Sequence, residues 1–230
     1  MPTLLVFGAR QLGRVLAGEF AADGWRVAGV ARTKETIRLF VEDVPDAVGV
    51  IADASKPNDV ERVFADVGDV DLVVNAITTT PRFGGPIHEA PPDGLEPYMT
   101  ELLPAIFNIL RVGGRVLAER GRGTLVQVTG GSARRGNPGR GPWAAAAFAT
   151  RALVQAQAAE LREQGVHAAL LIVDAVIESE KTAGWLEDAA PENSASMEEV
   201  AKAVKYLYSQ SPRGWTHELQ LTPSLERWVP

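Results

Sequence analysis

Short apolar runs alternate with longer segments of helical period along the whole chain, and this alternation most constrains the fold. The runs are rich in Val, Leu and Ile with little polar alternation, which is typical of strands covered by helices on both faces. We predict strands at Thr3–Phe7, Arg26–Ala31, Ala47–Ile51, Leu72–Asn75, Gly123–Thr129, Ala168–Val173 and Glu218–Leu221. We predict helices at Leu12–Ala22, Lys34–Glu42, Pro57–Val67, Glu96–Ala118, Ala144–Gln164 and Met197–Gln210. Successive βαβ units of this kind indicate an α/β protein with a doubly wound parallel sheet of about seven strands and helices on both faces.

The length of the chain suits one undivided domain. Its 230 residues lie within the usual range for a single α/β domain, so we assign residues 1–230 to one unit. Two long connections that contain Pro or Gly, residues 77–97 and 178–195, are the expected substrate loops. Connections of this length more often bind ligands or close over them than fill space.

Composition and charge exclude several kinds of site and partner. The chain has no cysteine, which excludes disulfides, thiolate metal sites and a cysteine nucleophile. Its three histidines are scattered, so we predict no metal site. A net charge of −6 argues against a nucleic-acid partner. The chain shows no basic signal-peptide region and no run of membrane-span length, so we expect a cytoplasmic protein with no membrane partner.

The clearest motif follows the first predicted strand directly. Residues 8–13 read GARQLG, the spacing G-x-G-x-x-G with arginine in place of the middle glycine. In a Rossmann-type fold, the first glycine permits a tight turn, the last lets the helix pack close to the strand, and the helix N-terminus attracts a pyrophosphate. The alternative is an ordinary β–α turn. We predict a dinucleotide site here, with contacts from Gly8, Arg10, Gln11, Leu12 and Gly13.

The tip of the second strand indicates which dinucleotide is bound. Proteins that bind NAD usually place Asp or Glu there for the ribose 2′-hydroxyl, whereas arginine accommodates a 2′-phosphate. This chain has Arg32 at the tip and Lys34 just beyond it, and Arg10 lies in the glycine turn. The alternative is a solvated basic rim. We therefore predict NADP(H) as the cofactor, with NAD(H) as the second choice.

Together with later segments, these residues resemble the short-chain dehydrogenase/reductase family over essentially the whole chain. The family's Asp after the third strand matches Asp53, and its Asn-Ala-Gly after the fourth strand looks like Asn75-Ala76-Ile77. Its A-x-E-L and G-[IV]-x-V segments match residues 158–161 and 165–168. The resemblance implies further cofactor contacts from Asp53, Ala54, Asn75, Ala76, Ile77, Ile177 and Ser179.

The residues that usually carry this family's chemistry do not match. The family has Tyr-x-x-x-Lys in the helix after the fifth strand, where tyrosine acts as acid or base and lysine lowers its pKa and holds the nicotinamide ribose. Counting back from Glu160 places Trp143 at the tyrosine position and Ala147 at the lysine position. An indole N–H only donates a hydrogen bond, so Trp143 cannot exchange a proton. None of the chain's tyrosines precedes a lysine by four residues; they are Tyr98, Tyr206 and Tyr208.

Other family positions are altered too. The serine at the end of the fifth strand falls near Gly130, and the asparagine of the preceding helix falls around Thr100–Leu102. The Pro-Gly after the sixth strand is replaced by Asp174-Ala175. Losing an acid–base group typically costs roughly 10²–10⁴-fold in rate. Catalysis would therefore need another proton donor.

Three residues at the carboxyl ends of central strands are candidate catalytic residues. The hydroxyls of Thr129 and Ser132 lie where ligands bind in such sheets and can hydrogen-bond a carbonyl oxygen. Partial burial would raise the pKa of Asp174 and let it donate a proton. For each of the three the alternative is a structural role in a turn. His88, in the connection 77–97, is the histidine to test for proton transfer.

The leading hypothesis is an NADP(H)-dependent oxidoreductase that acts on a small carbonyl or alcohol with a non-standard catalytic site. The cofactor would carry the hydride chemistry, and the protein would supply orientation and electrostatics. One alternative is a catalytically inactive protein that senses NADP(H) or scaffolds a partner. Another is a non-redox enzyme that reuses the fold. Family members commonly form dimers or tetramers, so the resemblance implies a homodimer or homotetramer.

Overall fold

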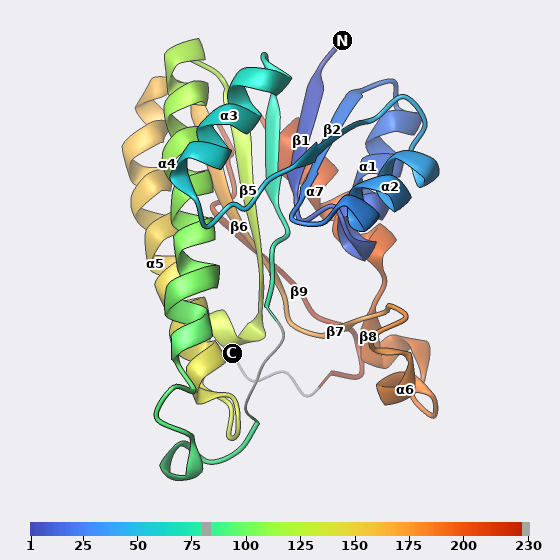
Figure 1. Cartoon of the computed structure of the whole chain (residues 1–230), viewed down its shortest axis with the longest axis vertical. Coiled ribbons are helices and arrows are strands. Elements are labelled where there is room, and N and C mark those ends of the chain that lie inside the picture. Colours follow the sequence, from blue (N-terminus) through green and yellow to red (C-terminus); the bar gives the residue numbers. More distant parts are fainter. Residues whose placement is uncertain (80–83, 227–230) are drawn as a thin grey trace.

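A parallel sheet forms the centre of the computed structural model, which describes residues 1–79 and 84–226 (Figure 1). The sheet is seven-stranded, in the order β3-β2-β1-β4-β5-β6-β9, and every pairing is parallel. The strands are β1 (Thr3–Phe7), β2 (Arg26–Ala31), β3 (Val48–Ile51), β4 (Leu72–Asn75), β5 (Gly123–Gly130), β6 (Val166–Val173) and β9 (Glu218–Leu221). The predicted doubly wound sheet is confirmed. The chain reverses its direction of winding between β1 and β4, and ligands bind at such a crossing, outside the carboxyl ends of the strands.

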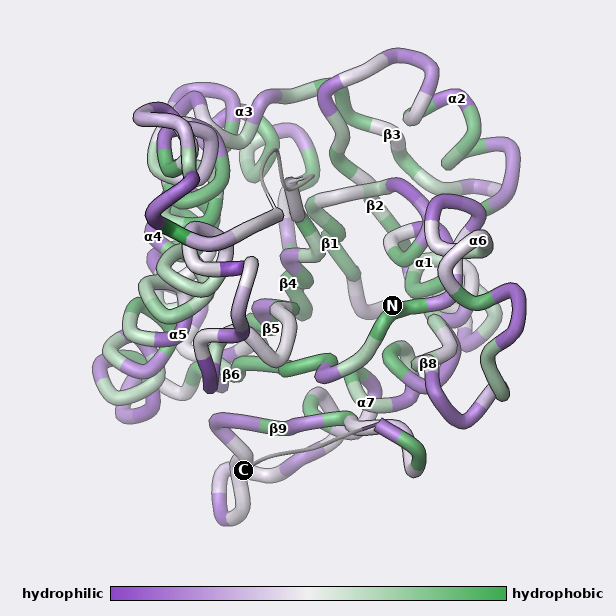
Figure 2. The backbone as a smooth tube through the Cα atoms, turned by 90° about the horizontal axis from the view of Figure 1, so that it is seen from below, coloured by the Kyte–Doolittle hydropathy of each residue, from purple (hydrophilic) through white to green (hydrophobic). Residues whose placement is uncertain are grey.

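Helices cover both faces of the sheet (Figure 1). One layer contains α1 (Gln11–Ala22), α2 (Lys34–Asp43) and α7 (Met197–Ser209); the other contains α3 (Pro57–Val67), α4 (Leu103–Arg120) and α5 (Gly141–Leu161). The packing of strand β1 on both of its faces explains why its sequence is uniformly apolar. Its Leu5 and Phe7 pack into the core under α3, α4 and α5, while Leu4 and Val6 pack into the core under α1, α2 and α7. Figure 2 shows the hydrophobic strands between these two layers, seen from the carboxyl edge of the sheet.

The long helix predicted at Glu96–Ala118 differs in its first turns. Residues Tyr98–Leu102 form a π-helical turn, η2, and the α-helix α4 begins at Leu103. Pro104 explains the difference, because it has no N–H group and its ring clashes with the carbonyl four residues earlier in a regular α-helix. The helical turn before α4 is therefore wider than a regular α-helical turn.

The connection 178–195 has structure of its own. A small two-stranded sheet joins β7 (Val176–Ile177) to β8 (Ser194–Ala195), and α6 (Ala183–Leu186) lies between them at the carboxyl edge, at the bottom of Figure 1. The connection 77–97 includes residues 80–83, which lie outside the described residues. Short helical turns complete the fold at η1 (Ile87–Glu89), η3 (Gly131–Ala133), η4 (Arg162–Gln164) and η5 (Pro191–Asn193).

In residues 1–79 and 84–226, no helix is long and apolar enough to cross a bilayer. The same ranges hold no group of three or more His, Asp or Glu side chains placed to bind a metal ion.

His167, near the start of β6, is a buried histidine at the amino edge of the sheet. It is 1% exposed and stacks on the indole of Trp215, with ring centroids 5.1 Å apart. Its Nε2 atom donates to the carbonyl oxygen of Thr216 at 2.9 Å, and its Nδ1 atom has no partner among the described residues. Burial lowers the pKa of His167 from its usual 6.5. The histidine is thus part of the core and is neutral in the folded protein at pH 7.

We expect His167 to make the fold sensitive to mild acid. As the pH falls through 6.5, the unfolded chain binds a proton that the folded chain does not, so the free energy of unfolding decreases by up to about 1.4 kcal/mol per pH unit until the lowered folded pKa is reached. Urea unfolding of His167→Gln at several pH values should show a shallower decrease than the wild type. His88→Gln, whose parent side chain is 81% exposed, is the control and should follow the wild type. Equal slopes for all three proteins would contradict the prediction.

Candidate functional site

The turn between β1 and α1 brings three backbone segments into close contact. Gly8 has φ +95°, a conformation that favours glycine, and a Cβ atom there would lie 2.9 Å from the backbone of Ala76. A Cβ atom on Gly13 would lie 2.2 Å from the carbonyl oxygen of Gly8. The amides of Gly8 and Ala9 donate to the carbonyl oxygen of Val30 at 3.0 Å. Both glycines are therefore required by the turn itself.

The N-terminus of α1 is open to an anion. Arg10 is the N-cap residue, and no side chain caps the helix. Its φ of −91° and ψ of −153° are ordinary for a residue with a side chain, so arginine in place of the middle glycine strains nothing. The first amides of an α-helix have no partner within the helix, and they lie at the positive end of its dipole. The residues present fit a pyrophosphate, which these amides would hold.

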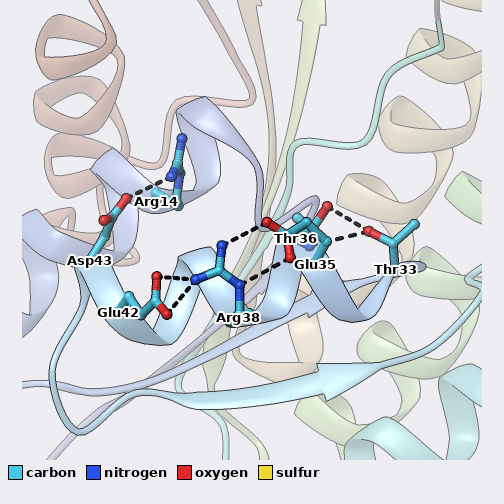
Figure 3. A network of polar contacts seen from close by, with 7 residues as sticks. All are labelled: Arg14, Thr33, Glu35, Thr36, Arg38, Glu42 and Asp43. Atoms are coloured by element: carbon cyan, nitrogen blue, oxygen red, sulfur yellow. Dashed lines mark hydrogen bonds and ion pairs between the residues drawn. The ribbon is translucent and has the colours of Figure 1, made fainter.

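The tip of β2 carries the cations predicted for the 2′-phosphate. The Arg32 side chain is 66% exposed and its nearest described anion is Glu101 in η2, with Nη1 3.6 Å from Oε2. Thr33 caps the following helix by accepting from the Thr36 amide at 3.2 Å. Figure 3 shows that Arg38 on α2 lies between two carboxylates, Glu35 and Glu42. Arg38 is thus engaged on its own helix, while Arg32 lies at the tip of β2 beside the turn.

Hydrogen bonds within the segment after β3, and one from a buried asparagine on α4, hold that segment in place. Asp53 is half-buried, and its Oδ1 accepts from the amide and the hydroxyl of Ser55 at 3.0 and 2.8 Å. Asn108 on α4 is 5% exposed and donates to the carbonyl oxygen of Ala54 at 3.0 Å. The sequence prediction missed Asn108. The available signal was an amide among the apolar residues on the buried side of α4.

A buried pair of amides fixes the segment after β4. Asn75 donates to Gln127 Oε1 at 2.8 Å, and its own Oδ1 accepts from the Ile77 amide at 3.0 Å. Both amide side chains are fully buried. Ala76 is the residue whose backbone touches Gly8. The predicted contacts Asn75, Ala76 and Ile77 therefore lie beside the glycine turn.

The predicted contacts after β6 lie at the same edge of the sheet. Ile177 is in β7, and its carbonyl oxygen accepts from the Thr182 hydroxyl at 2.7 Å. The hydroxyls of Ser179 and Thr182 are 2.9 Å apart. These contacts tie the start of the 178–195 connection into a compact turn.

Asp174 is held by a guanidinium group. Its two carboxylate oxygens accept from Arg135 at 2.7 and 2.8 Å, and Gln220 Nε2 donates to Oδ2 at 3.2 Å. The Asp174 side chain is 7% exposed and that of Arg135 is 22% exposed. Two parallel hydrogen bonds from one guanidinium group fix the position of a carboxylate. This geometry favours a structural role for Asp174 over proton donation.

The other two candidate catalytic residues, Thr129 and Ser132, carry hydroxyl groups that could bind a ligand. Thr129 is half-buried at the end of β5, and Ser132 in η3 is 4% exposed. Neither hydroxyl has a hydrogen-bond partner among the residues that the structure describes, which leaves both available to a ligand. His88, by contrast, is 81% exposed beside Glu89.

An apolar groove lies on the outer face of α4 and α5. It has a volume of about 660 Å³, and its lining includes Met99, Leu103, Phe107, Ala152 and Leu153. The rings of Phe107 and Phe148 are 50% and 44% exposed. None of the described residues that line the groove is charged. The homodimer or homotetramer expected from the sequence stays a prediction.

Comparison with known proteins decides the family. A family model described as enoyl-(acyl carrier protein) reductase matches residues 8–219, most of the chain. The chain belongs to the short-chain dehydrogenase/reductase family. The predicted fold class, a doubly wound parallel sheet with helices on both faces, is confirmed.

Several short-chain dehydrogenases/reductases are similar to this chain. An L-xylulose reductase from Bos taurus is 28% identical over 159 residues, 68% of this chain and 64% of the relative. The chain thus aligns with somewhat less than two thirds of that protein. An NADPH-dependent pterin aldehyde reductase from Arabidopsis thaliana is 27% identical over 70% of this chain and 69% of the relative. A gluconate 5-dehydrogenase from Burkholderia cenocepacia, solved with NADP and tartrate, is 22% identical with a TM-score of 0.84, covering 99% of this chain and 96% of that chain.

At Trp143 and Ala147, which the sequence analysis aligns with the family's tyrosine and lysine, the structure shows packing. Trp143 is half-buried in the first turn of α5, and Ala147 is 4% exposed one turn later. The Trp143 indole meets the ring of Tyr98 edge to face, with centroids 6.0 Å apart. Tyr98 comes from η2 and was not among the predicted site residues. Its signal in the sequence was weak, because no lysine stands four residues after it.

Proposed function

We propose that this chain is an NADP(H)-dependent oxidoreductase that interconverts a small carbonyl compound and the corresponding alcohol with a non-standard set of catalytic residues. The glycine turn carries this proposal. Gly13 lies so close to the Gly8 carbonyl that a side chain is excluded, and the uncapped helix N-terminus beside it suits a pyrophosphate.

The choice of NADP(H) over NAD(H) is supported by Arg32. A carboxylate at the tip of β2 would favour an unmodified ribose, whereas this chain places a mostly exposed guanidinium there. Charge-assisted hydrogen bonds to a phosphate contribute about 1.5–3 kcal/mol each. The relatives whose names include NADPH or whose structures hold NADP agree with this choice.

Replacing Arg32 with glutamate should reverse the nucleotide preference. We expect the affinity for NADPH to fall by about 10- to 100-fold, because a phosphate would meet a carboxylate in place of a guanidinium. The affinity for NADH, which lacks the phosphate, should change little. Calorimetric titration with both nucleotides measures the difference.

Arg213→Glu is the matched control for charge. Arg213 is exposed in the segment before β9, at the amino edge of the sheet, so the same charge change there should leave both affinities within about twofold of the wild type. If Arg32→Glu leaves the ratio of the two affinities unchanged, the 2′-phosphate assignment is wrong. If the wild type binds no adenine dinucleotide, the proposed function itself fails.

The chain's own residues would orient the reactants. The nicotinamide ring, when bound, supplies or accepts the hydride. The Asn75–Gln127 pair would hold the backbone after β4 in place, and Asp174 with Arg135 would hold η3 against the end of β6. The open hydroxyls of Thr129 or Ser132 would donate a hydrogen bond to the carbonyl oxygen.

A second candidate is a catalytically inactive protein that senses NADP(H). One feature supports it: the sequence aligns Trp143 with the family's tyrosine, and the Trp143 indole packs against Tyr98. Measuring substrate turnover distinguishes the oxidoreductase from the inactive sensor. With NADPH and a panel of small aldehydes and ketones, an oxidoreductase should consume NADPH, followed at 340 nm. A protein that binds NADPH tightly and turns over none of them would be a sensor.

A further inference from the structure

Tyr98 is the phenol at the edge of the sheet where ligands bind. Tyr206 and Tyr208 lie in the last turn of α7, and Tyr208 lines a small hollow with residues at the starts of β5 and β6, so both are at the amino edge. Tyr98 lies in η2, which precedes α4, and Trp143 opens α5 after β5; both are therefore at the carboxyl edge (Figure 1).

The Tyr98 ring faces the sheet. Tyr98, Leu102, Ala105 and Ile109 follow one another at spacings of four, three and four residues, and all are buried in the core under α4. Met99 and Leu103, on the other face, line the outer groove. Tyr98 is thus the last residue of the buried stripe, one turn beyond the residues that cover the strands. Ile77, which follows the end of β4, packs against the same core.

The hydroxyl of Tyr98 is open although its ring is buried. The residue as a whole is 2% exposed. Among the described residues, the fully buried side-chain atoms that lack a hydrogen-bond partner are Gln157 Oε1 and His167 Nδ1. The Tyr98 hydroxyl likewise makes no hydrogen bond to the described residues. A ring fixed against Trp143, with its oxygen free, is suited to meet a ligand.

Tyr98 is also the most suitable acid among the candidates. The carboxylate of Asp174 is bound on both oxygens by Arg135. The aliphatic hydroxyls of Thr129 and Ser132 release a proton far less readily than a phenol. Burial raises the pKa of Tyr98, so the phenol carries its proton at neutral pH. The π-helical turn that presents it is a feature often found at functional sites.

We infer, resting on the function proposed above, that the Tyr98 hydroxyl donates the proton to the substrate's carbonyl oxygen. In the reductive direction a hydride from the reduced nicotinamide forms the new C–H bond, and the π electrons of the C=O bond move to oxygen. That oxygen takes the proton of the Tyr98 O–H group and becomes the alcohol. The phenolate then recovers a proton from water. The donor thus comes from the helix before β5, where the family's donor comes from the helix after it.

The first test compares Tyr98→Phe with Tyr206→Phe. Tyr98→Phe keeps the ring that packs on Trp143 and removes only the oxygen. It should lower kcat by about 100-fold or more while the NADPH dissociation constant stays within about twofold. Tyr206 is 53% exposed on α7, and its variant should match the wild type in both measurements. A Tyr98→Phe protein that keeps more than about a third of the wild-type kcat would overturn the inference.

The second test does not need turnover. The oxidised nicotinamide carries a positive charge that the reduced one lacks, and a nearby cation favours a phenolate. Absorbance titration of the tyrosines at 295 nm should therefore show that NADP⁺, but not NADPH, lowers the apparent pKa of one phenol. The effect should be absent from Tyr98→Phe and present in Tyr206→Phe. No shift in the wild type, or a shift that survives in Tyr98→Phe, would show that Tyr98 is not at the nicotinamide.

Failure of the inference can be told apart from failure of the proposed function. If no dinucleotide binds, both are wrong. If NADP⁺ binds and shifts the Tyr98 titration but no carbonyl compound turns over, the oxidoreductase function and the proton donation are overturned, and only the placement of the phenol stands. If carbonyl compounds turn over and Tyr98→Phe is as active as the wild type, the function stands and another donor is required.

Discussion

Replacing Gly13 with alanine should lower the affinity for NADP(H) by about a hundredfold or more, a loss of about 2.8 kcal/mol. The new Cβ atom would lie 2.2 Å from the Gly8 carbonyl oxygen and 2.9 Å from its carbon. Because both are backbone atoms, the helix must move away from the strand. Its first amides would then no longer converge on the pyrophosphate. Titration of NADPH followed by calorimetry measures the loss.

Gly18→Ala is the matched control on the same helix. A Cβ atom at Gly18 meets no atom within 4 Å, so the variant should bind NADPH as the wild type does. Alanine also favours a helix over glycine by about 0.5–1 kcal/mol, so Gly18→Ala should be slightly more stable. Circular dichroism checks that Gly13→Ala remains folded. A folded Gly13→Ala protein with wild-type affinity would mean that the turn does not bind the pyrophosphate.

Gly131→Ala should destabilise the fold by displacing the Asp174 carboxylate. A Cβ atom at Gly131 would lie 1.8 Å from Asp174 Oδ1 and 2.5 Å from its Cγ, so the carboxylate must leave its place. Breaking a buried ion pair costs about 3–5 kcal/mol, and the partial exposure of Arg135 reduces this to about 2–3 kcal/mol. For a chain of this length we expect the Tm to fall by roughly 4–12 °C. Chemical denaturation and calorimetry measure both quantities.

The neighbouring glycine provides the comparison for Gly131. At Gly130 an added Cβ atom would meet only the Val173 carbonyl oxygen, at 3.8 Å, an ordinary contact. Gly130→Ala should therefore change the free energy of unfolding by less than about 1 kcal/mol. If the two variants are equally stable, the contact between Gly131 and Asp174 does not constrain the fold as described.

Much of the fold was predictable because it depends on local pattern. Strand β1 is apolar at every position because it lies between two helical layers, and its predicted bounds Thr3–Phe7 are those observed. The cap of α7 at Ser196, whose side chain accepts from the Glu199 amide, is likewise a local signal. The π-helical turn before α4 was missed because Pro104 breaks a helix that the surrounding residues otherwise favour.

The candidate site was predictable only in part, because only part of it depends on a local sequence pattern. The glycine turn lies within one short segment, so its spacing was visible in the sequence. The partners of Asp174 and Arg32 are distant along the chain, at Arg135 and Glu101. The pairing of β7 with β8 also joins segments that are far apart. None of these contacts has a local signature.

The sequence by itself determined the parallel sheet and the glycine turn, because each depends on residue type at fixed spacing. Only the tertiary structure decided that both oxygens of Asp174 are engaged and that Tyr98 meets Trp143 with its hydroxyl open. These facts depend on which side chains the folded layers bring within a few ångströms of one another. That is a property of packing between distant segments, and no local pattern encodes it.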